Sequence, residues 1–208
     1  MPATPPATTV MLTFDDGPDP RSTDALLDAL LAAGQRATFF VLGEHAARHP
    51  GLLLRLHAAG MWLGNHTYTH PHLTRLPPER VWAEIDRTQR TLLALTGVAP
   101  TVFRPPYGET SPRIRTIARS LGLTETLWAT DTRDWDGADA DVIVGRAATT
   151  VEPGAIVLMH DGGYRSTVQA LPRVLRELAA RGLETGPVPG ALPGPPTGSP
   201  RVASVVTD

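Results

Sequence analysis

Short apolar runs that predict buried β-strands alternate along this chain with longer segments whose apolar residues recur at helical spacing. Strands separated by helices favour a parallel β/α arrangement, and this alternation is the strongest constraint on the fold. The expected strands lie near residues 10, 39, 63, 102, 127 and 157. The expected helices cover 21–33, 44–59 with an interruption at Pro50-Gly51, 78–95, 111–121, 141–150 and 168–181.

The number of strands limits which β/α fold the chain can form. Six clear strands are too few for a closed barrel of eight units. A seventh strand near Leu183 is a poor candidate, because Glu184-Thr185-Gly186-Pro187 follows at once. The fold class expected is α/β, a distorted or incomplete (β/α) barrel with mainly parallel strands. An open doubly wound sheet is the alternative.

The 208 residues suit one domain with a substantial core. Residues 186–200 are dense in Pro and Gly and offer too few apolar side chains to fold. The sequence therefore predicts an N-terminal extension over 1–7, a single domain over 8–185 and a flexible tail over 186–208.

Two adjacent carboxylates, Asp15 and Asp16, lie at the exit of the first expected strand, where Gly17-Pro18 stops the apolar run. The active sites of β/α barrels lie at such strand ends. Neighbouring strand residues point to opposite faces, but a breaking turn can bring both carboxylates to one pocket. Their repulsion then requires a cation, either a metal or an arginine. The alternative is an ordinary turn built from Asp, Gly and Pro.

His66 and His70 are four residues apart and follow the expected strand at 62–65. In an extended strand they would be roughly 13 Å apart, too far to share one ion. One helical turn, ended at once by Pro71, would bring them roughly 6 Å apart, where both nitrogens can bind one zinc ion. The alternative is two surface histidines in a loop.

Any metal in this chain must be held by His and Asp, because there is no Cys. A carboxylate from Asp15 or Asp16 would complete a His-His-Asp set that keeps an open position for water. His72 is a further candidate ligand, although its place directly after Pro71 favours the rim of the site.

Three more groups follow strand ends. Arg104 precedes two prolines and would clamp whichever of the two aspartates does not hold the metal, or else form an ordinary salt bridge between loops. A carboxylate in the turn that contains Asp131, Asp134 and Trp135 could orient a histidine, or the turn could be a simple cap. His160 ends an apolar strand before two glycines, where a ligand can approach closely; a structural histidine is the alternative.

Together these pieces resemble the polysaccharide deacetylase family, also known as the NodB-homology domain or carbohydrate esterase family 4. The matching blocks are TFDDGP at 13–18, HTYTHP at 66–71, RPPYG at 104–108, DTRDW at 131–135 and Leu158-Met159-His160. Each block alone is a weak signal, but all five occur in family order. The resemblance covers about residues 8–182 and implies a distorted (β/α) barrel, whose final strand is in doubt here because the Pro/Gly-rich segment begins so early.

The resemblance implies roles for the metal-binding residues and the base. Asp16, His66 and His70 would bind one divalent metal, usually zinc and sometimes cobalt or nickel. Asp15 would be the general base, which Arg104 would hold ionised and oriented.

The remaining roles concern the proton donor and the substrate. His160 would be the general acid, tuned by Asp134, with Asp131 a weaker candidate for that role. The backbone N–H of Tyr107 would help to stabilise the oxyanion. The substrate-binding residues implied by the resemblance are Trp135, Leu158, Tyr107 and Pro106.

The implied function is metal-dependent removal of acetyl groups from glycans that contain N-acetylglucosamine, such as chitooligosaccharide or peptidoglycan. The alternatives are an acetylxylan O-acetyl esterase, a non-catalytic glycan-binding relative, and a phosphoester metallohydrolase, which would need more basic residues or a second metal. Besides this carbohydrate, no partner is expected: a net charge of −2 argues against nucleic acid, and no apolar run reaches the roughly 18 residues of a membrane span. A monomer is expected. The substrate class implies a secreted or cell-surface protein, although the first residues show no signal peptide.

Overall fold

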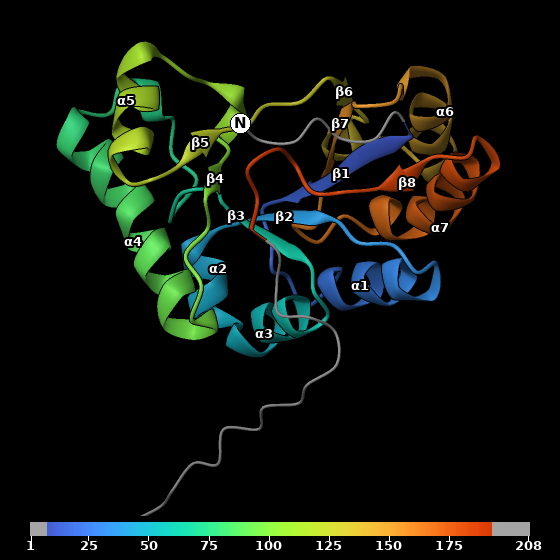
Figure 1. Ribbon diagram of the computed structural model, residues 1–208, viewed down its shortest axis with the longest axis horizontal. Coiled ribbons are helices and arrows are strands. Elements are labelled where there is room, and N and C mark those ends of the chain that lie inside the picture. Colours follow the sequence, from blue (N-terminus) through green and yellow to red (C-terminus); the bar gives the residue numbers. More distant parts are fainter. Residues whose placement is uncertain (1–7, 193–208) are drawn as a thin grey trace, which may run out of the picture.

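The computed structural model describes residues 8–192, which form a curled sheet of parallel strands with helices around its outer side (Figure 1). The first strand, β1 (Thr9–Asp15), is central and entirely buried. It pairs with β2, β7 and β8, and the sheet order is β5-β4-β3-β2-β1-β7-β6 with β8 beside β1. The other strands are β2 (Thr38–Val41), β3 (Trp62–Asn65), β4 (Val102–Phe103), β5 (Thr124–Glu125), β6 (Thr130–Asp131), β7 (Ile156–His160) and β8 (Glu184–Thr185). A distorted (β/α) barrel is thereby confirmed.

The helices agree with the expected positions to within a few residues. Pro50 occupies the first turn of α3, which explains the interruption between α2 and α3. The helices are α1 (Thr23–Ala32), α2 (Gly43–Arg48), α3 (Pro50–Ala58), α4 (Pro78–Thr96), α5 (Pro112–Ser120), α6 (Ala140–Thr150) and α7 (Arg165–Ala180). Figure 1 shows α4 and α5 on one side of the sheet and α6 and α7 on the other. Within 8–192, none of these helices has the length and hydrophobicity of a membrane span.

Alternation along β1 divides its side chains between two environments. Val10, Leu12 and Phe14 belong to the large core between the sheet and the helices. Met11 belongs to a second, smaller cluster on the inner side of the curled sheet, with Phe40, Val102 and Val188. Asp15 follows the same alternation as Met11, so the fold itself directs this carboxylate to the inner side of the sheet.

The single strand expected over 124–130 is wrong, because this stretch forms two strands at opposite edges of the sheet. β5 pairs with β4, whereas β6 pairs with β7. In the described structure, β5 and β6 do not pair with each other, which leaves a seam in the barrel wall. The side chain of Arg104 donates hydrogen bonds to the carbonyl oxygens of Thr126 and Leu127 at this seam, at 3.3 and 3.2 Å. A buried guanidinium therefore provides hydrogen-bond partners that a neighbouring strand would otherwise supply.

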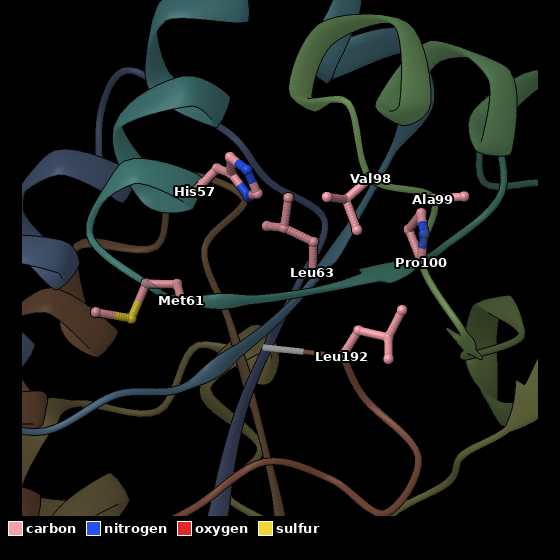
Figure 2. Close-up of a pocket in the computed structure, with 7 residues that line it drawn as sticks. All are labelled: His57, Met61, Leu63, Val98, Ala99, Pro100 and Leu192. Atoms are coloured by element: carbon pink, nitrogen blue, oxygen red, sulfur yellow. The ribbon is translucent and has the colours of Figure 1, made fainter. Parts of the chain in front are cut away.

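The chain continues to pack beyond the expected end of the domain at 185. β8 extends the contact with β1, and the N–H of Gly186 donates to the carbonyl of Val10 at 2.9 Å. Val188 is fully buried on the inner side of the sheet. Leu192 reaches a small hydrophobic pocket (Figure 2), which is lined by His57, Met61, Leu63, Val98, Ala99, Pro100 and Leu192. Residues 186–192 thus form part of the packed structure, while the rest of the expected tail, 193–208, lies outside the described residues.

Candidate active site

A cluster of three potential metal ligands lies where β1 and β3 end. Asp16, His66 and His70 each offer one ligand atom, and these atoms all lie within 4.8 Å of one another. The Nε2 atoms of His66 and His70 are each 3.4 Å from Oδ1 of Asp16. Among the described residues, this buried oxygen has no hydrogen-bond partner. Two imidazoles and a carboxylate with an unpartnered oxygen are a donor set that fits one divalent metal such as zinc.

The two histidines do not meet through a helical turn, so that expectation is wrong. The segment from His66 to His70 is an irregular loop in which Thr67 and His70 have left-handed φ angles of 70° and 60°. These two reversals place the ring centroids 5.0 Å apart. The hydroxyl of Thr67 accepts a hydrogen bond from the N–H of His70 at 3.2 Å, which closes the loop.

The environment of each histidine affects its readiness to bind a metal. Nδ1–H of His66 donates to the carbonyl oxygen of Arg104 at 2.7 Å, so Nε2 is the atom directed at the cluster. Burial lowers the pKa of His66, but the nearby Asp15 and Asp16 raise it by more, so metal and proton compete for this ring. Burial, and then the charge of His66, lower the pKa of His70 to about 4, which keeps His70 neutral near pH 7.

Arg104 binds Asp15 and not Asp16. Its side chain is fully buried, and Nη1 donates to Oδ1 of Asp15 at 2.8 Å and to the hydroxyl of Thr13 at 2.7 Å. The guanidinium also packs on the ring of Phe40, 4.1 Å from its centroid. The other carboxylate oxygen of Asp15 lies 3.7 Å from Nε2 of His66. Asp15 is therefore oriented on one side by a fixed cation, with its second oxygen beside the cluster.

His160, at the end of β7, is held by Asp134. Nδ1–H of His160 donates to Oδ1 of Asp134 at 2.8 Å, and the backbone N–H of His160 donates to Oδ2 at 2.8 Å. Burial lowers the pKa of His160, but the hydrogen bond and the charge of Asp134 raise it by more, to about 9. Of the two carboxylates considered, only Asp134 makes this contact; Asp131 instead accepts a hydrogen bond from the N–H of Arg133.

These groups share one cavity of about 290 Å³, which lies at the ends of the strands. The lining residues are Asp15, Asp16, His66, His70, Pro105, Tyr107, Trp128, Asp131, Trp135, Leu158, His160 and Tyr164. Tyr107 and Trp135 are 55% and 45% exposed, whereas Leu158 is buried. A single cavity thus combines the potential metal ligands, two ionisable side chains held by oppositely charged partners, and two exposed aromatic rings.

Some residues occupy places that the sequence did not indicate. Pro106 is buried and does not line the cavity; Pro105 does, because the chain turns into a short 3₁₀ segment at Pro106. His72, for which the sequence favoured the rim of the site over the ligand set, lies outside the cluster, with its ring stacked on Tyr107 at 4.1 Å between centroids. Trp128 and Tyr164 were not singled out, although both are aromatic residues within four positions of strand ends that carry site residues.

We expect substitution of Gly17 by alanine to destabilise the turn that carries Asp16. A Cβ at this position would lie 2.0 and 2.2 Å from the carboxylate oxygens of Asp161, which is buried and accepts a hydrogen bond from Thr23. Such overpacking costs about 1–3 kcal/mol, measurable as a loss in the free energy of unfolding by urea titration. The matched control is Gly145→Ala in α6, where a Cβ meets nothing within 4 Å. Equal stability of the two variants would contradict the expected clash.

Comparison with known proteins places this geometry in a family. The family model described as polysaccharide deacetylase matches residues 3–126. A peptidoglycan-N-acetylglucosamine deacetylase of Bacillus cereus is 38% identical over 176 residues, which cover 83% of this chain and 64% of that relative. A chitooligosaccharide deacetylase of Bradyrhizobium is 37% identical over 194 residues, which cover 86% of this chain and 89% of the relative. The chain thus spans just under two thirds of the length of the first relative and most of the second.

The structural likeness agrees with the sequence matches. A family 4 carbohydrate esterase from Streptomyces lividans, solved in complex with acetate, superposes with a TM-score of 0.84 at 42% identity. The match covers 88% of this chain and 96% of that one. With the family model matched over more than half of the chain and the fold shared over 88% of it, the protein belongs to the polysaccharide deacetylase family.

Proposed function

We propose that this chain removes acetyl groups from glycans that contain N-acetylglucosamine, using one bound divalent metal ion. The observation that carries the proposal is the shared cavity, which the Asp16–His66–His70 cluster lines together with Asp15 and His160. The names of the Bacillus and Bradyrhizobium relatives support a glycan substrate that contains N-acetylglucosamine.

Asp16, His66 and His70 would hold the metal, for which zinc is the first choice and cobalt or nickel are alternatives. A divalent ion held there supplies Lewis acidity, which polarises the acetyl carbonyl and makes water a better nucleophile. The low pKa of Asp16 supports this assignment. Burial opposes ionisation of Asp16, but its contact with His66 and the charges of His66, His160 and His70 hold its pKa well below the usual range.

The other residues of the cavity account for the proton transfers. Asp15, held by Arg104, takes a proton from the water that attacks the acetyl carbonyl. The backbone N–H of Tyr107 stabilises the oxyanion of the resulting tetrahedral intermediate. His160, protonated and held by Asp134, gives a proton to the departing nitrogen as the carbon–nitrogen bond breaks. Acetate and a free amine leave.

The cavity also suits the proposed substrate. Leu158 and Trp135 provide an apolar wall for the acetyl methyl group, and the exposed rings of Tyr107 and Trp135 provide surfaces on which sugar rings can pack. Since polymeric glycans of this class lie outside the cytoplasm, we also propose that the protein acts in the cell envelope or beyond it.

Acetate release from acetylated chitooligosaccharides and from acetylxylan, measured side by side, tests the proposal. Each assay is run after chelation and again with zinc or cobalt restored. Metal-dependent release from the chitooligosaccharide supports the proposed N-deacetylase. Release from xylan alone favours an O-acetyl esterase, the second candidate, which the likeness to the Streptomyces carbohydrate esterase supports. Folded, metal-loaded protein that releases acetate from neither substrate, nor from peptidoglycan, would contradict both.

Zinc is expected to raise the thermal unfolding midpoint of the chelated protein, because a ligand that binds only the native state stabilises it. At a free zinc concentration 100 times the Kd, the gain is about 2.7 kcal/mol. His70→Ala is expected to abolish this rise, whereas His72→Ala should retain it, because His72 contacts Glu109 and lies outside the cluster. Differential scanning fluorimetry with and without zinc makes the comparison. If His72→Ala loses the rise and His70→Ala keeps it, His72 and not His70 is the ligand.

A further inference from the structure

Glu84, on α4, holds the loop that carries both histidines of the cluster. Its Oε2 accepts hydrogen bonds from the backbone N–H groups of Tyr68 and Thr69, at 3.0 and 2.8 Å. Its Oε1 accepts a third from the hydroxyl of Thr69, at 3.0 Å. Glu84 belongs to none of the five sequence blocks and does not line the cavity. One carboxylate outside the site thus binds the middle of the loop three times.

Helix α2 also contacts this loop: the carbonyl oxygens of Thr67 and Tyr68 accept hydrogen bonds from the N–H groups of Gly43 and Glu44, at 3.0 and 3.1 Å. Of the five backbone N–H groups in 66–70, the other three donate to groups of β2, β3 or the loop: His66 to the carbonyl of Val41, Thr67 to Oδ1 of Asn65, and His70 to the hydroxyl of Thr67. Among these five N–H groups, only those of Tyr68 and Thr69 donate to a separate helix. Glu84 is therefore the link between the loop and α4 at the point where local contacts supply no acceptor.

This link matters because the loop is conformationally strained. Thr67 and His70 both have positive φ angles, a conformation that non-glycine residues keep only when the surrounding structure enforces it. The two middle residues lie between these reversals. α4 provides a rigid support, because Ile85, next to Glu84, is fully buried and its carbonyl accepts a hydrogen bond from Asn65 at 2.9 Å.

We infer that Glu84 is a positioning residue for the metal site, one that fixes the separation of His66 and His70 by holding the backbone between them. The inference rests on the proposed function, because it concerns the same site. Both backbone hydrogen bonds end on the same atom, Oε2. The loop therefore requires one acceptor oxygen at this distance from the backbone of α4, and the negative charge of Glu84 matters less. Glutamine at this position can supply that oxygen, whereas aspartate is one methylene too short.

The zinc dissociation constants of three variants test the inference, measured on the full chain by competition with a chromophoric chelator and without substrate. Glu84→Asp and Glu84→Ala are expected to weaken zinc binding about 10–100-fold, the range seen when residues that orient metal ligands from outside are removed. Glu84→Gln is expected to bind zinc like the wild type. Asp86→Ala on the same helix, where Asp86 pairs with Arg90, is the matched control and should leave binding unchanged. Undiminished zinc binding in Glu84→Asp, or a loss in Glu84→Gln equal to that in Glu84→Asp, would overturn the inference.

Amide hydrogen exchange in the metal-free protein tests whether Glu84 holds the backbone of Tyr68 and Thr69. The amides of Tyr68 and Thr69 are expected to exchange faster in Glu84→Asp than in the wild type, and to remain protected in Glu84→Gln. If these two amides are as well protected in Glu84→Asp as in the wild type, Glu84 does not hold the loop backbone. If the wild type binds no zinc, the proposed metal site is wrong and the inference falls with it. Zinc binding that survives unchanged in Glu84→Asp overturns the inference alone.

Discussion

Substitution of Asp15 by asparagine is expected to reduce kcat for acetate release by about 10²–10⁴-fold, the usual contribution of a general base. Asparagine keeps an oxygen that can accept the hydrogen bond of Arg104, now 2.8 Å from Oδ1, so the geometry of the cavity should persist. What is lost is the capacity to take a proton from water. Initial rates on an acetylated chitooligosaccharide with zinc present provide the measurement.

The matched control for this prediction is Asp16→Asn, on the next residue of the same turn. Asp16 lies 3.4 Å from both histidine Nε2 atoms and is one of the proposed metal ligands, so its substitution should weaken zinc binding and lower the rate together. Asp15→Asn should retain zinc binding while losing the rate. If Asp15→Asn loses zinc as Asp16→Asn does, the two carboxylates do not have separate roles.

His160→Ala is expected to lower the rate of amide cleavage by about 10²–10⁴-fold and the rate of ester cleavage by much less. An amine is a far poorer leaving group without a proton than an alkoxide is, so an N-acetyl substrate depends more on the acid. The fold should tolerate the change, because Asp134 keeps hydrogen bonds from the N–H of Trp135, the hydroxyl of Thr167 and the backbone N–H at position 160. Equal losses on an N-acetyl and an O-acetyl substrate would contradict the role as acid.

The environment of His160 also predicts how kcat/KM depends on pH. Because the net effect of burial and Asp134 raises the pKa of His160 to about 9, the ring is protonated below that pH and loses its proton above it. The kcat/KM for an N-acetyl substrate should therefore fall as the pH rises through about 9. Asp134→Asn removes the opposing charge, and this should move the falling limb about 1–3 units towards lower pH. A limb that stays in place in Asp134→Asn would show that another group titrates there.

Residues at strand ends were the part of the site that sequence patterns could locate. Apolar runs ending in Asp15, His66, Arg104 and His160 placed each of these groups at the same edge of a parallel sheet. In the structure Asp15, His66 and His160 line one cavity, and the buried Arg104 is hydrogen-bonded to Asp15. The resemblance implied the pairing of Arg104 with Asp15, and the two-residue alternation along β1 explains it in the structure. The sequence left open which carboxylate faces inward, because a turn at Gly17 can redirect either one.

Contacts that depend on tertiary packing could not be read from the sequence. A helical turn was the simplest way to join His66 and His70, but the loop instead uses left-handed residues that Glu84 supports from another helix. The split of 124–130 into two edge strands depends on where the sheet closes, which periodicity does not encode. The seventh strand near Leu183 was rated a poor candidate, yet β8 forms there; only two of its residues pair with β1, so the sequence pattern for it is short.

The guanidinium at the seam links the chemistry of this protein to the integrity of its barrel. Arg104 orients Asp15 with one nitrogen, while Nε and Nη2 bind the two carbonyls that the open edge leaves without a strand partner. Loss of Arg104 is therefore expected to disturb the barrel wall as well as Asp15, the proposed base, whereas loss of the His160 side chain is expected to leave the fold intact. In relatives that bind carbohydrate without catalysis, we therefore expect the residue at the position of His160 to be replaced before the arginine at the position of Arg104.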